Sequence, residues 1–265
     1  MRKLMEYKII SGRVVETKRS WFPMNNDYTK PRGTRRAGTS SEKKIRANEK
    51  SSERNLARVI NCNFDAGDMF CTLAYDSGHY SAGFDYEQAK EMLKRFRSKL
   101  RKAYKTGTGK SLKAIWVTAN WSPHKNAPAR LHHHMILPAD ALELARSIWE
   151  DFGGPGTFKM EGIDGRIDHS DMAAYMMENV NDRPAGENKW SCCRGMDRPI
   201  YTEPVEVLDM EDMQPDYGST IMDVEECRDE DGVLISKYMR CKLKERPAVR
   251  GGQVVLPKKP GRKKT

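Results

Sequence analysis

The chain has 265 residues with a net charge of +10, and 38% of them are apolar and 32% charged, enough to bury one sizeable core. No apolar run approaches the ~20 residues of a membrane span, and no secretory apolar segment follows the basic start. The six cysteines form no C-x-x-C pair, which excludes zinc-knuckle spacing and favours a reducing cytoplasm as the location.

Charge is segregated along the sequence. Residues 1–61 hold sixteen Lys and Arg against six acidic residues, a net charge of +10, and residues 242–265 hold nine against one, a net charge of +8. From Glu206 to Asp231, eleven acidic residues accompany one basic residue. Basic flanks on an acidic body predict a polyanionic partner, with nucleic acid the first candidate. Solvated tails without a partner have the same composition.

The first elements follow from local composition. Residues 1–40 predict irregular chain with one short strand near residues 7–15 and a basic linker at 30–38. A helix capped by Ser40 or Ser41 is expected over 42–60, then a strand over 68–75. Residues 86–104 predict a helix because five apolar residues fall on one stripe: Ala89, Leu93, Phe96, Leu100 and Tyr104.

The second half predicts a long hairpin of strands 112–121 and 130–138. A helix over 139–151, a strand over 157–163, and a helix over 171–180 capped by Ser170 follow. Residues 181–216 predict loops, and two strands are expected near 220–225 and 232–238. The order predicts an α+β fold, a central antiparallel sheet with helices packed on it, in place of a doubly wound parallel sheet.

Three consecutive histidines occupy the strand 130–138. Because strand side chains alternate between faces, His132 and His134 share one face and His133 points to the other. Two neutral imidazoles one step apart on a rigid strand can bind one divalent metal ion. The alternative is a polar patch on a half-exposed strand, with one histidine in the core.

The order of these motifs resembles a known family. Thr72–Tyr75, a basic helix, His132-x-His134, the helical Tyr175 and then Trp190-Ser-Cys-Cys-Arg-Gly-Met occur in this sequence. This is similar to the rolling-circle replication initiators (Rep) of the HUH endonuclease superfamily. The phage and plasmid replication proteins related to the filamentous-phage replication endonuclease are the most similar members. The resemblance covers residues 40–240.

The resemblance implies a fold, an activity and partners. It implies a ferredoxin-like nuclease core, in which His132 and His134 hold a divalent metal, Mg²⁺ or Mn²⁺, and Tyr175 attacks single-stranded DNA at a replication origin. The product is a 5′-phosphotyrosine link and a free 3′-hydroxyl. Host replication helicase and polymerase are the further partners, in the bacterial cytoplasm, with no membrane. Arg130, Lys189 and Arg194 are candidate phosphate contacts.

The implied domains are a basic N-terminal segment (1–40), the nuclease domain with its basic first helix (41–182), a C-terminal extension (183–241) and a basic disordered tail (242–265). Three residues depart from the family pattern. Ala119 stands where relatives carry an acidic third ligand, with Asn120 or His124 as substitutes. Glu178 replaces a lysine, and Asn179 replaces a second tyrosine, which makes this a one-tyrosine enzyme.

Other functions stay open at this point. Tyr175 shares a helical stripe with Met172 and Met176, and a tyrosine in such a stripe ordinarily packs in a core. One alternative is a nucleic-acid-binding protein on the same fold with a decayed active site. The other is a metal-dependent nuclease that uses water as its nucleophile, with Tyr175 structural. A covalent protein–DNA adduct would distinguish the tyrosine endonuclease from both of these alternatives.

Overall fold

A computed structural model describes residues 2–23, 42–81, 83–181, 187–250 and 253–257. The chain forms two compact units, residues 52–197 and residues 1–51 with 198–265. The expected contiguous domains are therefore wrong in one respect, because residues 198–241 of the supposed C-terminal extension belong to the same unit as the N-terminal strands. The expected linker at 30–38 and the expected caps Ser40 and Ser41 lie outside the described residues.

The unit 52–197 is built as strand, helix, strand, strand, helix, strand. These elements are β3 (Met69–Leu73), α3 (Tyr86–Thr108), β4 (Ile115–Ser122), β5 (Ala127–Leu137), α4 (Leu142–Gly153) and β6 (Phe158–Gly162). The sheet order is β6-β3-β5-β4-β7, where β7 is Ser191–Cys192, and every pair is antiparallel. This is the predicted α+β fold, in the order of the ferredoxin-like split βαβ arrangement.

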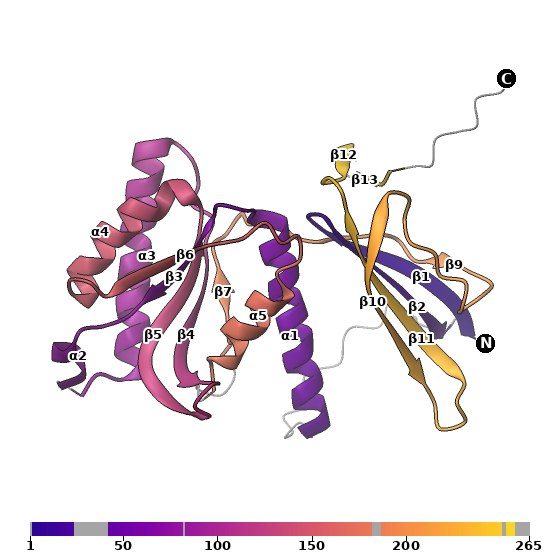
Figure 1. Cartoon of the computed structure of the whole chain (residues 1–265), viewed down its shortest axis with the longest axis horizontal. Coiled ribbons are helices and arrows are strands. Elements are labelled where there is room, and N and C mark those ends of the chain that lie inside the picture. The colour runs from indigo at the N-terminus through magenta and orange to yellow at the C-terminus, as the bar shows by residue number, and fades with distance from the viewer. Residues whose placement is uncertain (1, 24–41, 82, 182–186, 251–252, 258–265) are drawn as a thin grey trace. The chain divides into compact units, whose positions relative to one another are not determined.

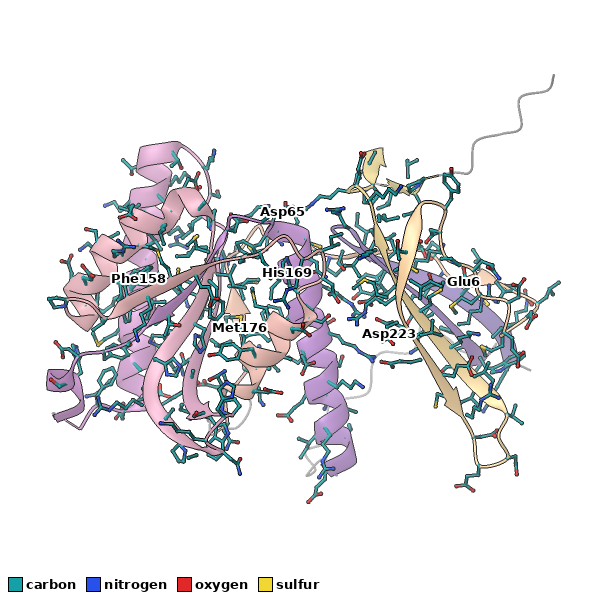
Figure 2. All side chains as sticks on the ribbon, in the orientation of Figure 1. Glu6, Asp65, Phe158, His169, Met176 and Asp223 are labelled. Carbon is teal, nitrogen blue, oxygen red and sulfur yellow. The ribbon has the colours of Figure 1, made fainter. Side chains whose placement is uncertain are left out.

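Helices cover both faces of this sheet (Figure 1). The helices α3 and α4 lie on one face, and α1 (Glu42–Asn63) and α5 (Ser170–Glu178) lie on the other. The short α2 (Ser77–Ser81) and the 3-10 turn Ala139–Ala141 connect these elements. Strand alternation separates the two cores, with Trp116 and Met135 in the first and Val117 and Ile136 in the second. Phe158 and Met176, labelled in Figure 2, belong to the first and second core respectively.

Helix α3 begins and ends where the local chemistry predicts. Asp85 and Gln88 form a capping box, in which each side chain accepts a hydrogen bond from the other residue's backbone N–H. Gly109 ends the helix in the left-handed region at φ 72°, which a glycine adopts without the steric cost of a Cβ. The five predicted stripe residues are all buried, so the helix is fixed against the sheet by its apolar face.

The other unit is an antiparallel sheet in the order β10-β11-β2-β1-β8, with β9 also paired to β1. Its strands are β1 (Arg2–Ser11), β2 (Val14–Pro23), β8 (Ile200–Tyr201), β9 (Val205–Glu206), β10 (Ser219–Arg228) and β11 (Leu234–Leu243). The expectation that residues 1–40 are irregular is wrong for 2–23, which form a hairpin of two ten-residue strands. Gly12, at φ 60°, makes its two-residue turn possible.

The basic tail is also more ordered than expected. Strand β11 continues to Leu243, and β12 (Ala248–Arg250) pairs with β13 (Gln253–Val255). Arg13 donates hydrogen bonds to the carbonyl oxygens of Leu243 and Lys244. The expectation of a disordered tail is therefore wrong up to residue 250 and for 253–257, and residues 251–252 and 258–265 lie outside the described part.

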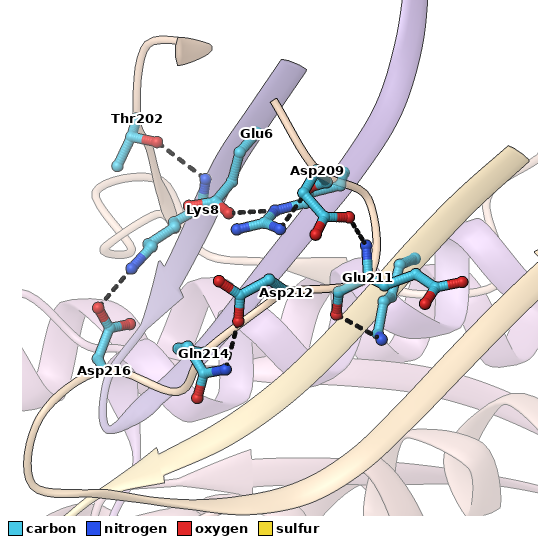
Figure 3. Close-up of polar contacts among 10 residues, drawn as sticks. Glu6, Lys8, Thr202, Asp209, Glu211, Asp212, Gln214 and Asp216 are labelled. Carbon is cyan, nitrogen blue, oxygen red and sulfur yellow. Dashed lines mark hydrogen bonds and ion pairs between the residues drawn. The ribbon is translucent and has the colours of Figure 1, made fainter. Parts of the chain in front are cut away.

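Three basic residues of β1 and β2 have partners in the acidic segment that follows β8, among them Lys8 (Figure 3). Arg19 binds Glu6 at 2.7 Å and donates to the carbonyl of Asp209 at 2.6 Å. Lys8 forms an ion pair with Asp216, and Lys3 binds Glu206 at 2.6 Å. Two lysines of β1 thus form ion pairs with acids of residues 206–216, whereas the acid that pairs with Arg19 is Glu6 of β1 itself.

Candidate active site

The histidine strand β5 lies in the middle of the sheet, between β3 and β4, and its side chains alternate as expected. His132 and His134 share the face that α5 covers. Their Nε2 atoms are 3.2 Å apart, and their rings are nearly perpendicular at 87°. The alternation of side chains along the strand therefore brings the Nε2 atoms of His132 and His134 close together.

His132 is oriented by its own strand. Its Nδ1 lies 2.8 Å from the carbonyl oxygen of Arg130. A carbonyl oxygen only accepts, so Nδ1 carries the proton and Nε2 keeps its lone pair. Burial lowers the pKa of His132, against a smaller opposite effect of this hydrogen bond. A backbone carbonyl behind the far nitrogen is the usual support of a metal-binding histidine.

His134 is held by its neighbours in the sheet. Its Nδ1 lies 3.2 Å from Thr72 Oγ1 on β3, and its ring stacks on Phe70 at 5.1 Å. Burial lowers the pKa of His134 to about 3, with His132 adding to the effect and a hydrogen bond to Asn179 opposing it. Both imidazoles are therefore neutral near pH 7, the form that can donate a lone pair to a metal ion.

His133 belongs to the opposite core. It is fully buried, its Nε2 lies 2.6 Å from the Tyr75 hydroxyl, and its Nδ1 lies 3.1 Å from Thr118 Oγ1. Its ring packs edge-on against Trp149. Both ring nitrogens thus have partners on the α3–α4 side of the sheet. His133 therefore faces away from His132 and His134.

Tyr175 projects from α5 beside the histidine pair. Its ring centroid is 5.3 Å from that of His134 and 6.0 Å from that of Phe70. The side chain is 39% exposed, whereas Met176, next to it on the helix, is fully buried. A tyrosine serving only as core packing would be covered as Met176 is. The structure thus brings together the three predicted residues His132, His134 and Tyr175.

The start of α5 differs from the prediction. The helix begins at Ser170 and its N-cap is His169, which makes no side-chain capping bond. The Ser170 hydroxyl donates instead to Asp168 at 2.8 Å. Asn61 on α1 fixes this corner, because its side chain binds the His169 amide at 3.0 Å and Asp168 at 3.3 Å. Attachment to α1, and not a serine cap, positions the first turn.

The end of α5 is attached to β4 by Asn179, whose role the sequence did not reveal. Its side-chain Nδ2 donates to the Tyr175 carbonyl at 2.7 Å. The same side chain forms a hydrogen bond with His134. A bulge between Ala119 and Trp121 frees two backbone N–H groups of β4. Both donate to the Asn179 carbonyl, at 3.0 and 3.1 Å. One residue therefore links the tyrosine helix, a histidine and the sheet.

The donor set fits a divalent ion with two protein ligands. Two imidazole nitrogens each ~2.1 Å from one ion lie roughly 3.0–3.4 Å apart at bond angles of about 90–110°, and the 3.2 Å separation falls in this range. Ala119 lies opposite His132 and offers no donor. The Asn120 Oδ1 accepts from the Asn181 amide, and His124 is exposed in the β4–β5 turn. Within the described ranges, no three His, Cys, Asp or Glu side chains group as metal ligands.

A cavity of about 570 Å³ adjoins this site. Phe70, Thr72 and Tyr175 line one side of it, and β6 with the loop that precedes α5 lines the other. Arg166 in that loop binds Asp164 at 2.6 Å and Asp171 at 3.4 Å. The cavity therefore provides a space beside the tyrosine and the histidine pair.

The three predicted phosphate contacts are not gathered at this cavity. Arg130 contributes its carbonyl to His132, and its side chain is exposed. Lys189 lines a second cavity beside the first half of α3. Arg194 lines a third cavity with α3 residues between Glu91 and Lys105, on the face of the sheet opposite the histidine pair.

No protein-family model matches the chain, and neither do any curated proteins or solved structures. Among the described residues, no helix combines the length and apolar content that a membrane crossing requires. Any assignment of function therefore rests on the geometry of the site and on the motif order.

Proposed function

We propose that the chain is a metal-dependent endonuclease that nicks single-stranded DNA at a replication origin through Tyr175, and so initiates rolling-circle replication of a mobile element. One observation carries the proposal. Two neutral histidines converge through Nε2 at 3.2 Å, and the half-exposed Tyr175 ring lies 5.3 Å from one of them. The βαββαβ sheet that supports this group is the core that the motif order implies.

The chemistry is a transesterification. The Tyr175 hydroxyl oxygen bonds to phosphorus while the bond from phosphorus to the 3′ oxygen breaks. The phenol loses its proton and the 3′ oxygen gains one, so no redox partner is needed. A divalent ion, Mg²⁺ or Mn²⁺, held by His132 and His134 would polarise the phosphate and offset its developing charge. The 5′-phosphotyrosine bond conserves the phosphodiester energy for later joining.

The free 3′-hydroxyl suits priming by a host polymerase, and opening of the duplex suits a host helicase. Both are therefore proposed partners in the cytoplasm of a bacterial host. The exposure of Tyr175 supports this function over the two alternatives, a binding protein without activity and a nuclease that uses water. In either alternative Tyr175 would be a structural residue, and its partly exposed ring would have no task.

A covalent adduct tests the proposal. Incubation with a single-stranded origin oligonucleotide and Mn²⁺ is expected to give a protein–DNA adduct that survives denaturing electrophoresis, and a chelator should prevent it. Tyr175→Phe removes only the hydroxyl, so the adduct should disappear while DNA binding persists. Tyr201→Phe, an exposed tyrosine in the other unit, is the matched control and should form the adduct normally. Cleavage without an adduct would assign the reaction to water.

A further inference from the structure

The chain segment between Glu91 and Asp140 contains eleven Lys and Arg and no acidic residue. Over the whole unit 52–197 the counts are nearly equal, twenty basic against nineteen acidic. Positive charge is therefore concentrated on α3 and the two strands that follow it. Grouping like charges costs energy unless an anion offsets it.

Nine of these eleven basic residues fall into two groups, and Arg194 joins the second. Lys99, Lys110 and Lys113 are each paired with an acid, namely Asp151 at 2.8 Å, Asp140 at 3.6 Å and Asp197 at 2.6 Å. A second group lines a cavity of about 1050 Å³ between α3 and residues 191–194. Within the described chain, no acidic side chain lies at ion-pair distance from five members of this group: Arg97, Arg101, Lys102, Lys105 and Arg194.

Arg97 is the most constrained of the five. Its guanidinium lies 3.6 Å from the centroid of the Trp116 ring, and both residues line this cavity, which we call the groove. Burial lowers the pKa of Arg97, and the nearby charge of Arg101 lowers it further. A cation stacked on an aromatic face and close to a second cation is preorganised for a planar, bidentate anion such as phosphate.

We propose that the groove between α3 and Ser191–Arg194 binds the phosphodiester backbone of a nucleic acid. The stretch from Lys94 to Lys105 extends ~16 Å along the helix, which matches several successive phosphates of one strand. Four of the seven basic residues that line the groove are arginines, the side chain that best matches phosphate oxygens. The groove lies on the face of the sheet opposite Tyr175, so it is a second site that holds the strand away from the cleavage point.

A matched pair of double variants tests the groove. Arg101→Gln/Lys105→Gln removes two exposed charges that line it, and Lys99→Gln/Lys113→Gln removes two charges that are paired with acids. Glutamine is a good helix former, so both proteins should keep the wild-type denaturation midpoint. Affinity for a fluorescein-labelled 30-nucleotide strand and for the corresponding duplex is measured by anisotropy between 50 and 300 mM salt.

The groove variant is expected to bind the single strand about 25-fold more weakly at 0.1 M salt, with a salt slope smaller by ~1.4, because each lost phosphate contact removes ~0.7. The control should stay within about twofold of wild type. A loss on the strand or on the duplex supports the groove and identifies the form it holds. Equal affinities of the two variants for both forms would overturn the proposal. Binding of poly-glutamate is measured as well. A loss of affinity confined to poly-glutamate would also overturn the proposal, because it would assign the groove to an acidic protein.

The two proposals fail separately. Adduct formation at saturating DNA depends on Tyr175 and should persist in both double variants. Tyr175→Phe should keep the full salt slope. If no adduct ever forms but the groove variant loses its salt slope, the groove stands and the nicking activity does not. If the adduct forms but the slopes are equal, the nicking activity stands and the groove does not.

Discussion

Three adjacent histidines have three different environments because strand β5 turns each side chain to the opposite face. His133 is enclosed between Tyr75 and Thr118, whereas His132 and His134 face each other across 3.2 Å. The fixed proton on His132 Nδ1 leaves its Nε2 free to donate a lone pair. The three histidines therefore differ in their chemical roles because they occupy different faces of the sheet, although their residue type is the same.

Removal of either member of the pair should abolish metal binding. His132→Ala and His134→Ala are each expected to weaken Mn²⁺ binding by more than ~10-fold, because a two-ligand site cannot lose one ligand and hold the ion. Imidazole suits Mn²⁺ better than Mg²⁺, so calorimetric titration with Mn²⁺ is the measurement.

His133→Gln is the matched control for this titration. It can replace some of the bonds to Tyr75 and Thr118 and should bind Mn²⁺ as wild type does, although its denaturation midpoint should fall. Equal loss of Mn²⁺ from all three variants would contradict the assignment of the ligands to one face of the strand.

At the residue scale, the sequence predicts the face that a side chain occupies where the two-residue alternation of a strand determines it. It separated His133 from the pair, whereas the place of Tyr175 beside the pair was expected from the resemblance to the endonuclease family. It missed Asn179, because the role of that residue depends on a bulge in β4, which no local pattern predicts. It also named Asn120 and His124 as possible substitute ligands, but the Asn120 Oδ1 accepts from the Asn181 amide and His124 is exposed in the β4–β5 turn.

At the scale of elements, α5 is a nine-residue helix, too short to be stable by itself. Its two ends are fixed from outside, by Asn61 of α1 at the start and by the β4 bulge at the end. The position of Tyr175 therefore depends on bonds that are not part of the helix.

Loss of the Asn179 side chain should loosen the end of the helix. Asn179→Ala removes the bonds to the Tyr175 carbonyl and to His134, which should cost about 1–3 kcal/mol of unfolding free energy and slow adduct formation at saturating DNA. The DNA affinity should stay unchanged, since the groove on α3 is untouched.

Glu178→Ala is the control for the same turn. Its side chain is exposed, so its unfolding free energy should change by less than about 0.5 kcal/mol and its adduct rate should stay near wild type. An Asn179→Ala protein with a wild-type adduct rate would show that Asn179 does not position the tyrosine.

The elements themselves were predictable where periodicity is strong. Helix α3 and the β4–β5 hairpin appear as expected, with ends shifted by a few residues. The β1–β2 hairpin was missed, although Gly12-Arg13 between two β-rich stretches is a signal for a two-residue turn. The charged residues of β1 obscured that signal, because their acidic partners lie about 200 residues further along the chain.

At the scale of the whole molecule, the pairing of β1 with β8 and of β2 with β11 joins the two ends of the chain in one unit. Sequence order predicts contiguous domains and cannot show such distant pairings. In the same unit, two lysines of β1 form ion pairs with acids of residues 206–216. Composition favoured the two basic flanks for nucleic-acid binding and did not single out the cavity beside α3, where five cations have no acid at ion-pair distance within the described residues.

Acid should destabilise the metal-free protein well before carboxylates are protonated. Burial lowers the pKa of His133 from 6.5 to about 3, and burial also lowers the pKa of His169, against the opposing charges of Asp168, Asp164 and Asp65. At a pH between the unfolded and the folded pKa of such a histidine, the unfolded chain binds more protons than the folded chain. This contribution to stability is therefore full above pH 6.5 and is lost as the pH falls toward the folded value, at up to ~1.4 kcal/mol per pH unit for each such group.

Denaturant titrations at pH 7, 6 and 5 in the presence of a chelator measure this slope. The unfolding free energy should fall continuously across that range, and His169→Gln should make the fall shallower by removing one titrating group. His124→Gln, which replaces an exposed histidine, is the matched control. A wild-type protein equally stable at pH 7 and pH 5 would contradict the burial of neutral histidines in the folded chain, since protonation of the unfolded state has to appear as lost stability.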